Sequence, residues 1–148
     1  MDFALRVAES TAFSLHALIG LTEPCHGALE FTLQVKGSLP RFFWPLAGLL
    51  LGVASYANFS GSEEAVLCAQ AYVAAFHTGA MFWHWRLQHH PASVLAPLLF
   101  VGLAAAVFWL RLGSFLLAFL GTAASAGIGA ALGSLLVRPP REDQPLLQ

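Results

Sequence analysis

The sequence predicts an all-α integral membrane protein, a single bundle of four or five transmembrane helices. Two observations predict this class. Hydrophobic residues make up 57% of the 148 residues and charged residues only 10%, whereas a soluble domain carries about 25% charged residues. The apolar residues also gather into runs of about 20, the length that a helix needs to cross the hydrocarbon core. The net charge of −1, without a basic run, argues against nucleic acid as a partner.

The first apolar segment, residues 3–21, is more polar than the others. Its polar side consists of Arg6, Glu9, Ser10, His16 and Gly20. We expect this segment to span the membrane with its polar side turned into the bundle and with Arg6 paired with Glu9 at i,i+3. The alternative is an amphipathic helix that lies at the membrane surface.

Four further segments have the composition of membrane spans: 42–59, 65–85, 94–110 and 114–137. Pro45 lies in the first turn of its segment, where proline is tolerated. The run Ser60-Gly-Ser-Glu63 has the pattern of a capping box that opens the next helix, and Pro91 precedes the one after it. The break at 111–113 is so short that the last two helices are expected to form a tight antiparallel hairpin.

The distribution of cations predicts the orientation. With five spans, one side of the membrane holds Lys36, Arg41, Arg86, Arg138 and Arg141, and the other side holds Arg6, Arg111, Glu63 and Glu64. The positive-inside rule places the C-terminus on the cytoplasmic, matrix or stromal side. Residues 1–137 then form a single transmembrane domain and 138–148 a polar tail, in an energy-converting organelle or the endomembrane system. Cys25 and Cys68 fall near opposite faces, so we expect no disulfide between them.

A polar stripe follows one face of the segment 65–85. It consists of Gln70, His77, Met81 and His84, and Gln88 continues it. Polar groups at this depth face protein, water or a bound group, and we expect structural roles for the histidines. The alternative is a cofactor site at His77, His16 and His84, because His16 and His77 lie at similar depth. Two such histidines can hold a haem iron between them, and one can hold a chlorophyll magnesium. No metal-ion site is expected.

Small residues recur every four positions along the last segment. One row is Gly121, Ser125, Gly129 and Gly133, and the adjoining row is Ala118, Thr122, Ala126, Ala130 and Ser134. Such rows let two helices approach closely in a membrane. They indicate packing within the chain's own bundle or docking to another membrane subunit.

These patterns favour a non-enzymatic accessory or assembly subunit of a larger membrane complex, because no catalytic arrangement of side chains is present. One alternative is a haem- or chlorophyll-carrying subunit of a redox or light-harvesting assembly. The other is a small transporter, although the sequence lacks the internal repeat typical of many transporters. The expected partners are membrane lipids and other membrane subunits, the latter bound through the last helix.

Three loose motifs lie between residues 39 and 112. They are Leu39-Pro40 leading into Pro45-Leu-Ala-Gly48-Leu-Leu-Leu-Gly52, the helix end Ala80–Leu87, and Ala96-Pro97. In these motifs the chain resembles the DoxX-like family of small four-helix membrane proteins. The resemblance implies a link to quinone-linked redox complexes or to the assembly of partners. The family commonly has a glutamate after the glycine of its second helix, whereas here leucines follow Gly48.

Two short motifs suggest processing or sorting. Asn58-Phe-Ser60 has the N-glycosylation pattern, and residues 142–147 look like an acidic dileucine sorting signal.

Overall fold

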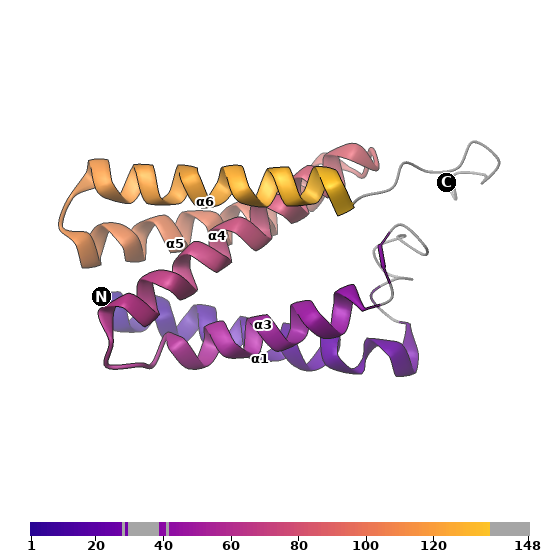
Figure 1. Ribbon diagram of the computed structural model, residues 1–148, viewed down its shortest axis with the longest axis horizontal. Helices are drawn as coiled ribbons and strands as arrows, with labels where there is room; N and C mark the ends of the chain where they lie inside the picture. The colour runs from indigo at the N-terminus through magenta and orange to yellow at the C-terminus, as the bar shows by residue number, and fades with distance from the viewer. Residues whose placement is uncertain (28, 30–38, 41, 137–148) are drawn as a thin grey trace.

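The computed structural model describes residues 1–27, 29, 39–40 and 42–136, and every regular element in these ranges is helical. The elements in chain order are α1 (Asp2–His26), α3 (Phe43–Ala57), α4 (Glu63–Arg86), the 3₁₀ turn η1 (Pro91–Val94), α5 (Leu95–Leu112) and α6 (Phe115–Leu136). The predicted all-α class is therefore confirmed. α1, α4 and α6 begin at one end of the bundle, where α3 and α5 end (Figure 1). We call this end the N-terminal end.

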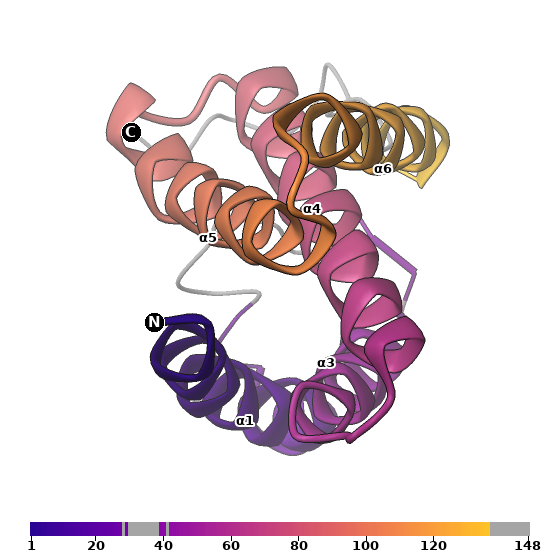
Figure 2. The ribbon, with the colours of Figure 1, turned by 90° about the vertical axis from the view of Figure 1, so that its left-hand side faces the viewer.

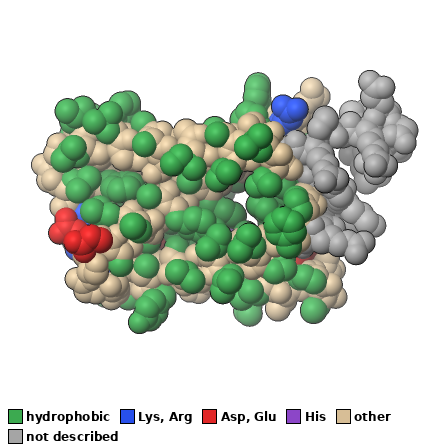
Figure 3. Space-filling view, in the orientation of Figure 1, with side chains coloured by type: hydrophobic (Ala, Val, Ile, Leu, Met, Phe, Trp, Pro, Cys, Tyr) green, Lys and Arg blue, Asp and Glu red, His purple; other side chains and the backbone are tan. Residues whose placement is uncertain are grey.

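Three of the described helical segments are long and apolar enough to cross a membrane, judged by length and composition. They are Glu63–Arg86, Pro91–Leu112 and Phe115–Leu136. The helix α3 is apolar but only 15 residues long, and α1 has 25 residues but carries buried charged side chains. Large apolar side chains cover much of the bundle's flank (Figure 3). This surface suits contact with lipid tails.

The helices form two groups that α4 joins. α1 packs along α3, while α5 and α6 both pack against α4 and each other. The end-on view in Figure 2 shows α4 passing from α3 to the α5–α6 pair. Between the groups lies an apolar core, made of Phe13, Ala17, Leu51, Val73, Ala74 and Ala104.

Glycines allow the closest helix contacts. A Cβ atom on Gly48 of α3 would lie 2.7 Å from the Ala17 carbonyl oxygen of α1, and one on Gly20 would lie 2.9 Å from the Trp44 oxygen. A Cβ atom on Gly129 of α6 would overlap the backbone of Ala75 on α4. Backbones at this distance gain dispersion contact that a larger side chain would prevent.

The turns between helices differ in part from the prediction. Gly113 ends α5 with a φ of 61° and donates to the Trp109 oxygen at 2.9 Å, so the tight α5–α6 hairpin is confirmed. The prediction of a capping box that begins at Ser60 is wrong. The residue that caps α4 is Ser62, whose Oγ accepts from the Ala65 N–H at 3.2 Å. The reason is that Ser60 still belongs to the turn after α3, where its N–H bonds to Ala57.

Candidate functional site

Near the N-terminal end of the bundle, polar side chains from α1, α3 and α4 meet inside the protein. Glu9, Asn58 and Gln70 are completely buried, and Ser10 and Ser55 are nearly so. We call these five residues the polar cluster. Ionisable and amide groups at such positions in membrane bundles are costly to bury, so they mark a candidate functional site.

The three larger side chains of the cluster are hydrogen-bonded to one another. Glu9 Oε2 accepts from Gln70 Nε2 at 2.9 Å and from Asn58 Nδ2 at 3.2 Å. Gln70 Nε2 also donates to Asn58 Oδ1 at 2.8 Å. By contrast, Glu9 Oε1 and Gln70 Oε1 are buried without a hydrogen-bond partner in the described structure. The cluster therefore has more acceptors than donors.

Two serines connect the cluster to the α1–α3 contact. Ser55 Oγ donates to the Ser10 carbonyl oxygen at 3.0 Å, and Ser10 Oγ donates to the Ser55 carbonyl oxygen at 3.3 Å. Ser14 Oγ lies 2.9 Å from Ser55 Oγ. These reciprocal bonds satisfy small polar groups within the helix interface, as is common between membrane helices.

Charged side chains lie between the cluster and the N-terminal end. Arg6 pairs with Asp2 at 3.1 Å and donates to the Asn58 backbone oxygen, and Arg111 of α5 pairs with Asp2 at 2.8 Å. The predicted Arg6–Glu9 pair is wrong. Arg6 points back one turn to Asp2, because the carboxylate of Asp2 and the free carbonyl at the end of α3 both lie there. Glu9 instead faces the amide groups of Asn58 and Gln70.

The polar stripe of α4 does face the bundle, as predicted, at three of its positions. Gln70, His77 and His84 are buried, Met81 is half-buried, and Gln88 is exposed beyond the end of the helix with a φ of 55°. Each buried member meets different groups: Gln70 joins the polar cluster, His77 lies among phenylalanine rings, and His84 contacts His89. These contacts do not link the three side chains into one path.

His77 and His16 come to the same level of the bundle, with the Phe100 ring beside both. The centroid of the Phe100 ring lies 4.6 Å from that of His77 and 6.5 Å from that of His16. Their Nδ1 atoms lie 2.8 Å and 2.9 Å from the carbonyl oxygens of Val73 and Ala12, one turn earlier. A histidine oriented in this way presents Nε2 to a ligand. Phe13 and Phe76 also pack on His77. His16 is exposed, so the expectation that it turns into the bundle with Arg6, Glu9, Ser10 and Gly20 is wrong for this residue. Haem or chlorophyll binding at His77, His16 or His84 stays a prediction.

His84 lies toward the opposite end of α4 from the polar cluster, where its Nδ1 lies 2.8 Å from Nδ1 of His89. Trp83 packs on both imidazole rings. One of the two nitrogen atoms must accept while the other donates, so the contact requires at least one neutral histidine.

This contact predicts a loss of stability in acid. Burial lowers the pKa of His89, so the folded protein favours neutral His89, while the unfolded chain takes up a proton below about pH 6.5. The stability contributed by neutral His89 is complete above that pH and decreases as the pH falls below it. We expect the thermal midpoint in detergent to fall between about pH 7.5 and about pH 5.5, and to fall less in His89→Gln. Identical pH profiles of the two proteins would contradict the prediction.

The first small-residue row of α6 faces the chain's own helices. A Cβ on Gly133 would lie 3.2 Å from the Gly79 oxygen of α4, and one on Gly121 would lie 3.5 Å from the Phe108 ring of α5. Gly129 meets Ala75, and Ser125 is buried in the same row. These four residues pack within the bundle, and docking to another subunit through them stays a prediction.

The outer face of α6 carries a third small-residue row, which was not among the rows predicted from the sequence. Ala123, Gly127 and Ala131 recur every four residues and are all exposed. No atom of another helix lies within 4 Å of a Cβ placed on Gly127. Only the packing of the first row against α4 and α5 identifies this third row as the outward one.

The glycosylation motif is not available in the folded protein. Asn58 is completely buried, and its side-chain nitrogen donates to Glu9 and Ser10. The interpretation of Asn58 as a glycosylation site is therefore wrong. Cys25 and Cys68 are not joined by a disulfide, and both are exposed. The dileucine motif at 142–147 and the cations at 36, 41, 138 and 141 lie outside the described residues.

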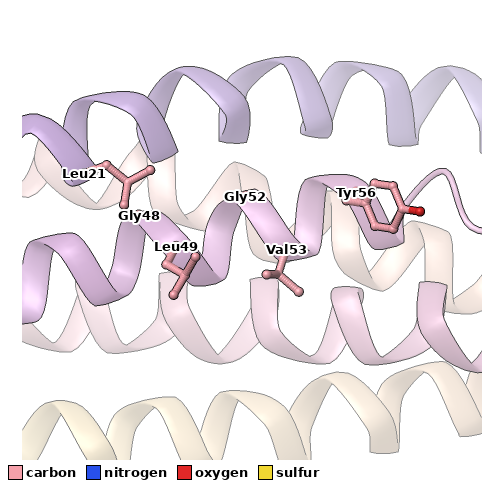
Figure 4. A pocket seen from close by; sticks show the side chains of 6 residues that line it. All are labelled: Leu21, Gly48, Leu49, Gly52, Val53 and Tyr56. Atoms are coloured by element: carbon pink, nitrogen blue, oxygen red, sulfur yellow. The ribbon is translucent and has the colours of Figure 1, made fainter.

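An apolar hollow lies on the outer surface of α1 and α3. Its lining is Leu21, Gly48, Leu49, Gly52, Val53 and Tyr56 (Figure 4). A second apolar hollow lies between α5 and α6, beside Trp109 and Phe119. Neither lining includes a histidine or a carboxylate, so the candidate site is the buried polar cluster and not these hollows.

The contact of Glu9 with Asn58 and Gln70 was not predicted from the sequence. The sequence did contain a signal for this contact. Glu9 in the segment 3–21 and Gln70 in the segment 65–85 lie on polar faces, at similar distances from the starts of their segments. Comparisons of the chain with protein-family models, curated proteins and solved structures found no match. The resemblance to the DoxX-like family stays a prediction.

Proposed function

We propose that the chain is a non-enzymatic integral membrane protein that acts as an accessory or assembly subunit of a larger membrane complex. The observation that carries this proposal is the exposed row of Ala123, Gly127 and Ala131 on the outer face of α6. A small residue every four positions provides a flat strip on which a helix of another subunit can pack closely.

The position of Gly127 supports a partner more than a role in the fold. Glycine destabilises a helix interior by about 1 kcal/mol relative to alanine, and Gly129 and Gly133 already allow the close contact with α4. A Cβ atom placed on Gly127 would have no atom of another helix of the described bundle within 4 Å. A glycine at this position would allow a helix of a neighbouring subunit to approach the backbone of α6 closely, which is a physical reason for it.

The use of the polar side chains supports a non-enzymatic role. Glu9, Asn58 and Gln70 bond to one another, and Arg6 and Arg111 both bond to Asp2. In this arrangement the polar groups hold α1, α3, α4 and α5 together.

We further propose that all five helices cross the membrane. α1 turns Arg6, Glu9 and Ser10 inward and exposes leucines at 15, 18 and 21. Its 25 residues extend over roughly 37 Å, enough to cross the hydrocarbon core. The shorter α3 can be accommodated by local thinning of the bilayer. In this arrangement Arg86 and the end of α6 share the cytoplasmic, matrix or stromal side, in an energy-converting organelle or the endomembrane system.

The test is the native size of the protein extracted from its membrane in mild detergent. We expect the wild type to migrate in an assembly, and Gly127→Leu to reduce the assembled fraction about tenfold, which corresponds to 1.4 kcal/mol. The matched control is Gly102→Leu, because Gly102 is exposed on α5 and a Cβ atom placed on it would also have no atom of another helix within 4 Å. Monomeric wild type, or equal migration of all three proteins, would contradict the proposal.

A further inference from the structure

The hydrogen bonds around Glu9 are distributed unequally between its two oxygen atoms. Oε2 accepts from both Gln70 and Asn58, whereas Oε1 is buried and has no donor in the described structure. An ionised carboxylate carries its charge on both oxygens, and both accept hydrogen bonds. A protonated carboxyl group has one carbonyl oxygen that accepts and one O–H group. Two amide donors on Oε2 by themselves stabilise a carboxylate. The buried Oε1 without a donor is what fits the protonated form, with the proton on Oε1.

No cationic side chain is bonded to Glu9 in the described structure. On its own helix, Arg6 bonds to Asp2 and to the Asn58 backbone oxygen, so its charge acts on Glu9 only without direct contact. Arg111 of α5 bonds to Asp2. The groups that α3 and α4 turn toward Glu9 are the uncharged Asn58 and Gln70. A buried carboxylate without a bonded cation is strongly disfavoured in an apolar bundle, and such a group takes up a proton instead.

We propose that Glu9 is a binding site for an exchangeable proton, which its carboxyl group holds on Oε1 while Gln70 and Asn58 bind Oε2. A metal cation such as Na⁺ is the competing ligand, since Glu9 Oε1 and Gln70 Oε1 are both free acceptors. A hard cation needs a fuller shell of oxygen ligands than these two atoms provide. A proton, by contrast, binds to a single oxygen atom, and Glu9 Oε1 is such an atom.

The proton exchanges at the N-terminal end of the bundle. Glu9 lies about two helical turns from Asp2 on α1, and the side chains of Asp2 and Arg111 are 25% and 27% exposed. Loss of the proton places a charge between α1 and α4. These two helices meet through side chains, among them Glu9 with Gln70 and Phe13 with His77. Deprotonation of Glu9 therefore loosens α1 from α4, which makes the packing of α1 dependent on the pH at that end.

Infrared spectroscopy of the full chain in detergent tests the proposal. We expect the wild type at neutral pH to show the carbonyl stretch of a protonated carboxylic acid, and Glu9→Gln to lack it. Glutamine keeps an oxygen for the two amide donors and puts a donor at the position of Oε1, so this variant is expected to fold. The matched control is Glu64→Gln, an exposed glutamate on α4, which is expected to keep the band.

Two results would overturn the proposal. One is a difference spectrum between wild type and Glu9→Gln that contains only ionised-carboxylate bands at neutral pH. The other is a wild-type spectrum that changes with Na⁺ concentration at fixed pH, which would assign the site to a metal cation. If Glu9→Gln does not fold, the carbonyl band of the wild type tests the proposal without the variant. It must be present at neutral pH and disappear in alkaline solution, and its absence at neutral pH overturns the proposal.

Discussion

Gly129→Ala is expected to lower the free energy of unfolding by about 2–4 kcal/mol, since overpacking typically destabilises by 1–3 kcal/mol and occasionally by more. The added Cβ would overlap the Ala75 carbonyl oxygen and lie 2.6 Å from its carbonyl carbon. These are backbone atoms of α4, so they cannot rotate away as a flexible side chain could. α4 and α6 must therefore separate. Reversible unfolding in mixed detergent micelles measures the loss.

Gly127→Ala is the matched control for this prediction. It makes the same substitution two residues away on the same helix, at a position where no atom of another helix lies within 4 Å of the new Cβ. Because alanine is the better helix former, we expect no loss of stability and a gain of up to about 1 kcal/mol. Equal losses in the two variants would show that α6 does not pack on α4 through Gly129.

The second large effect is expected for Gln70→Leu, with a loss of about 2–5 kcal/mol. Gln70 Nε2 donates to both Glu9 Oε2 and Asn58 Oδ1, and all three side chains are completely buried. Leucine leaves Asn58 Oδ1 without this donor and Glu9 Oε2 with one donor in place of two. A buried polar atom that loses its partner costs about 1–3 kcal/mol. The same unfolding measurement applies, together with helix content from circular dichroism.

Thr78→Val is the control for Gln70→Leu. Thr78 is also on α4 and half-buried, but its hydroxyl donates only to the Ala74 oxygen of its own helix, at 2.8 Å. Such a bond within one turn adds little to stability, so we expect a change below about 1 kcal/mol. If Gln70→Leu is as mild as Thr78→Val, the polar cluster does not hold α1 and α3 to α4.

The sequence by itself determined where the helices lie along the chain and, for α4, the side that turns inward. The segment 65–85 became α4 (Glu63–Arg86), and the segment 94–110 became α5 (Leu95–Leu112). Apolar runs of this length have one stable form in a membrane-like environment, because a helix satisfies its backbone groups internally. The inward direction of the polar stripe followed from the same physics, since Gln70, His77 and His84 avoid lipid by facing protein.

Only the tertiary structure decided which groups meet. Arg6 could pair with Asp2 or with Glu9 within one helix, and the end of α3 favours Asp2 because it places the Asn58 carbonyl beside Arg6. The small-residue row of α6 fits any closely packed neighbour, and the fold selects Ala75 and Gly79 of α4. Such choices depend on contacts between residues about 50 positions apart. Local pattern does not encode these contacts, because helix propensity and hydrophobic period are the same whichever helix is the neighbour.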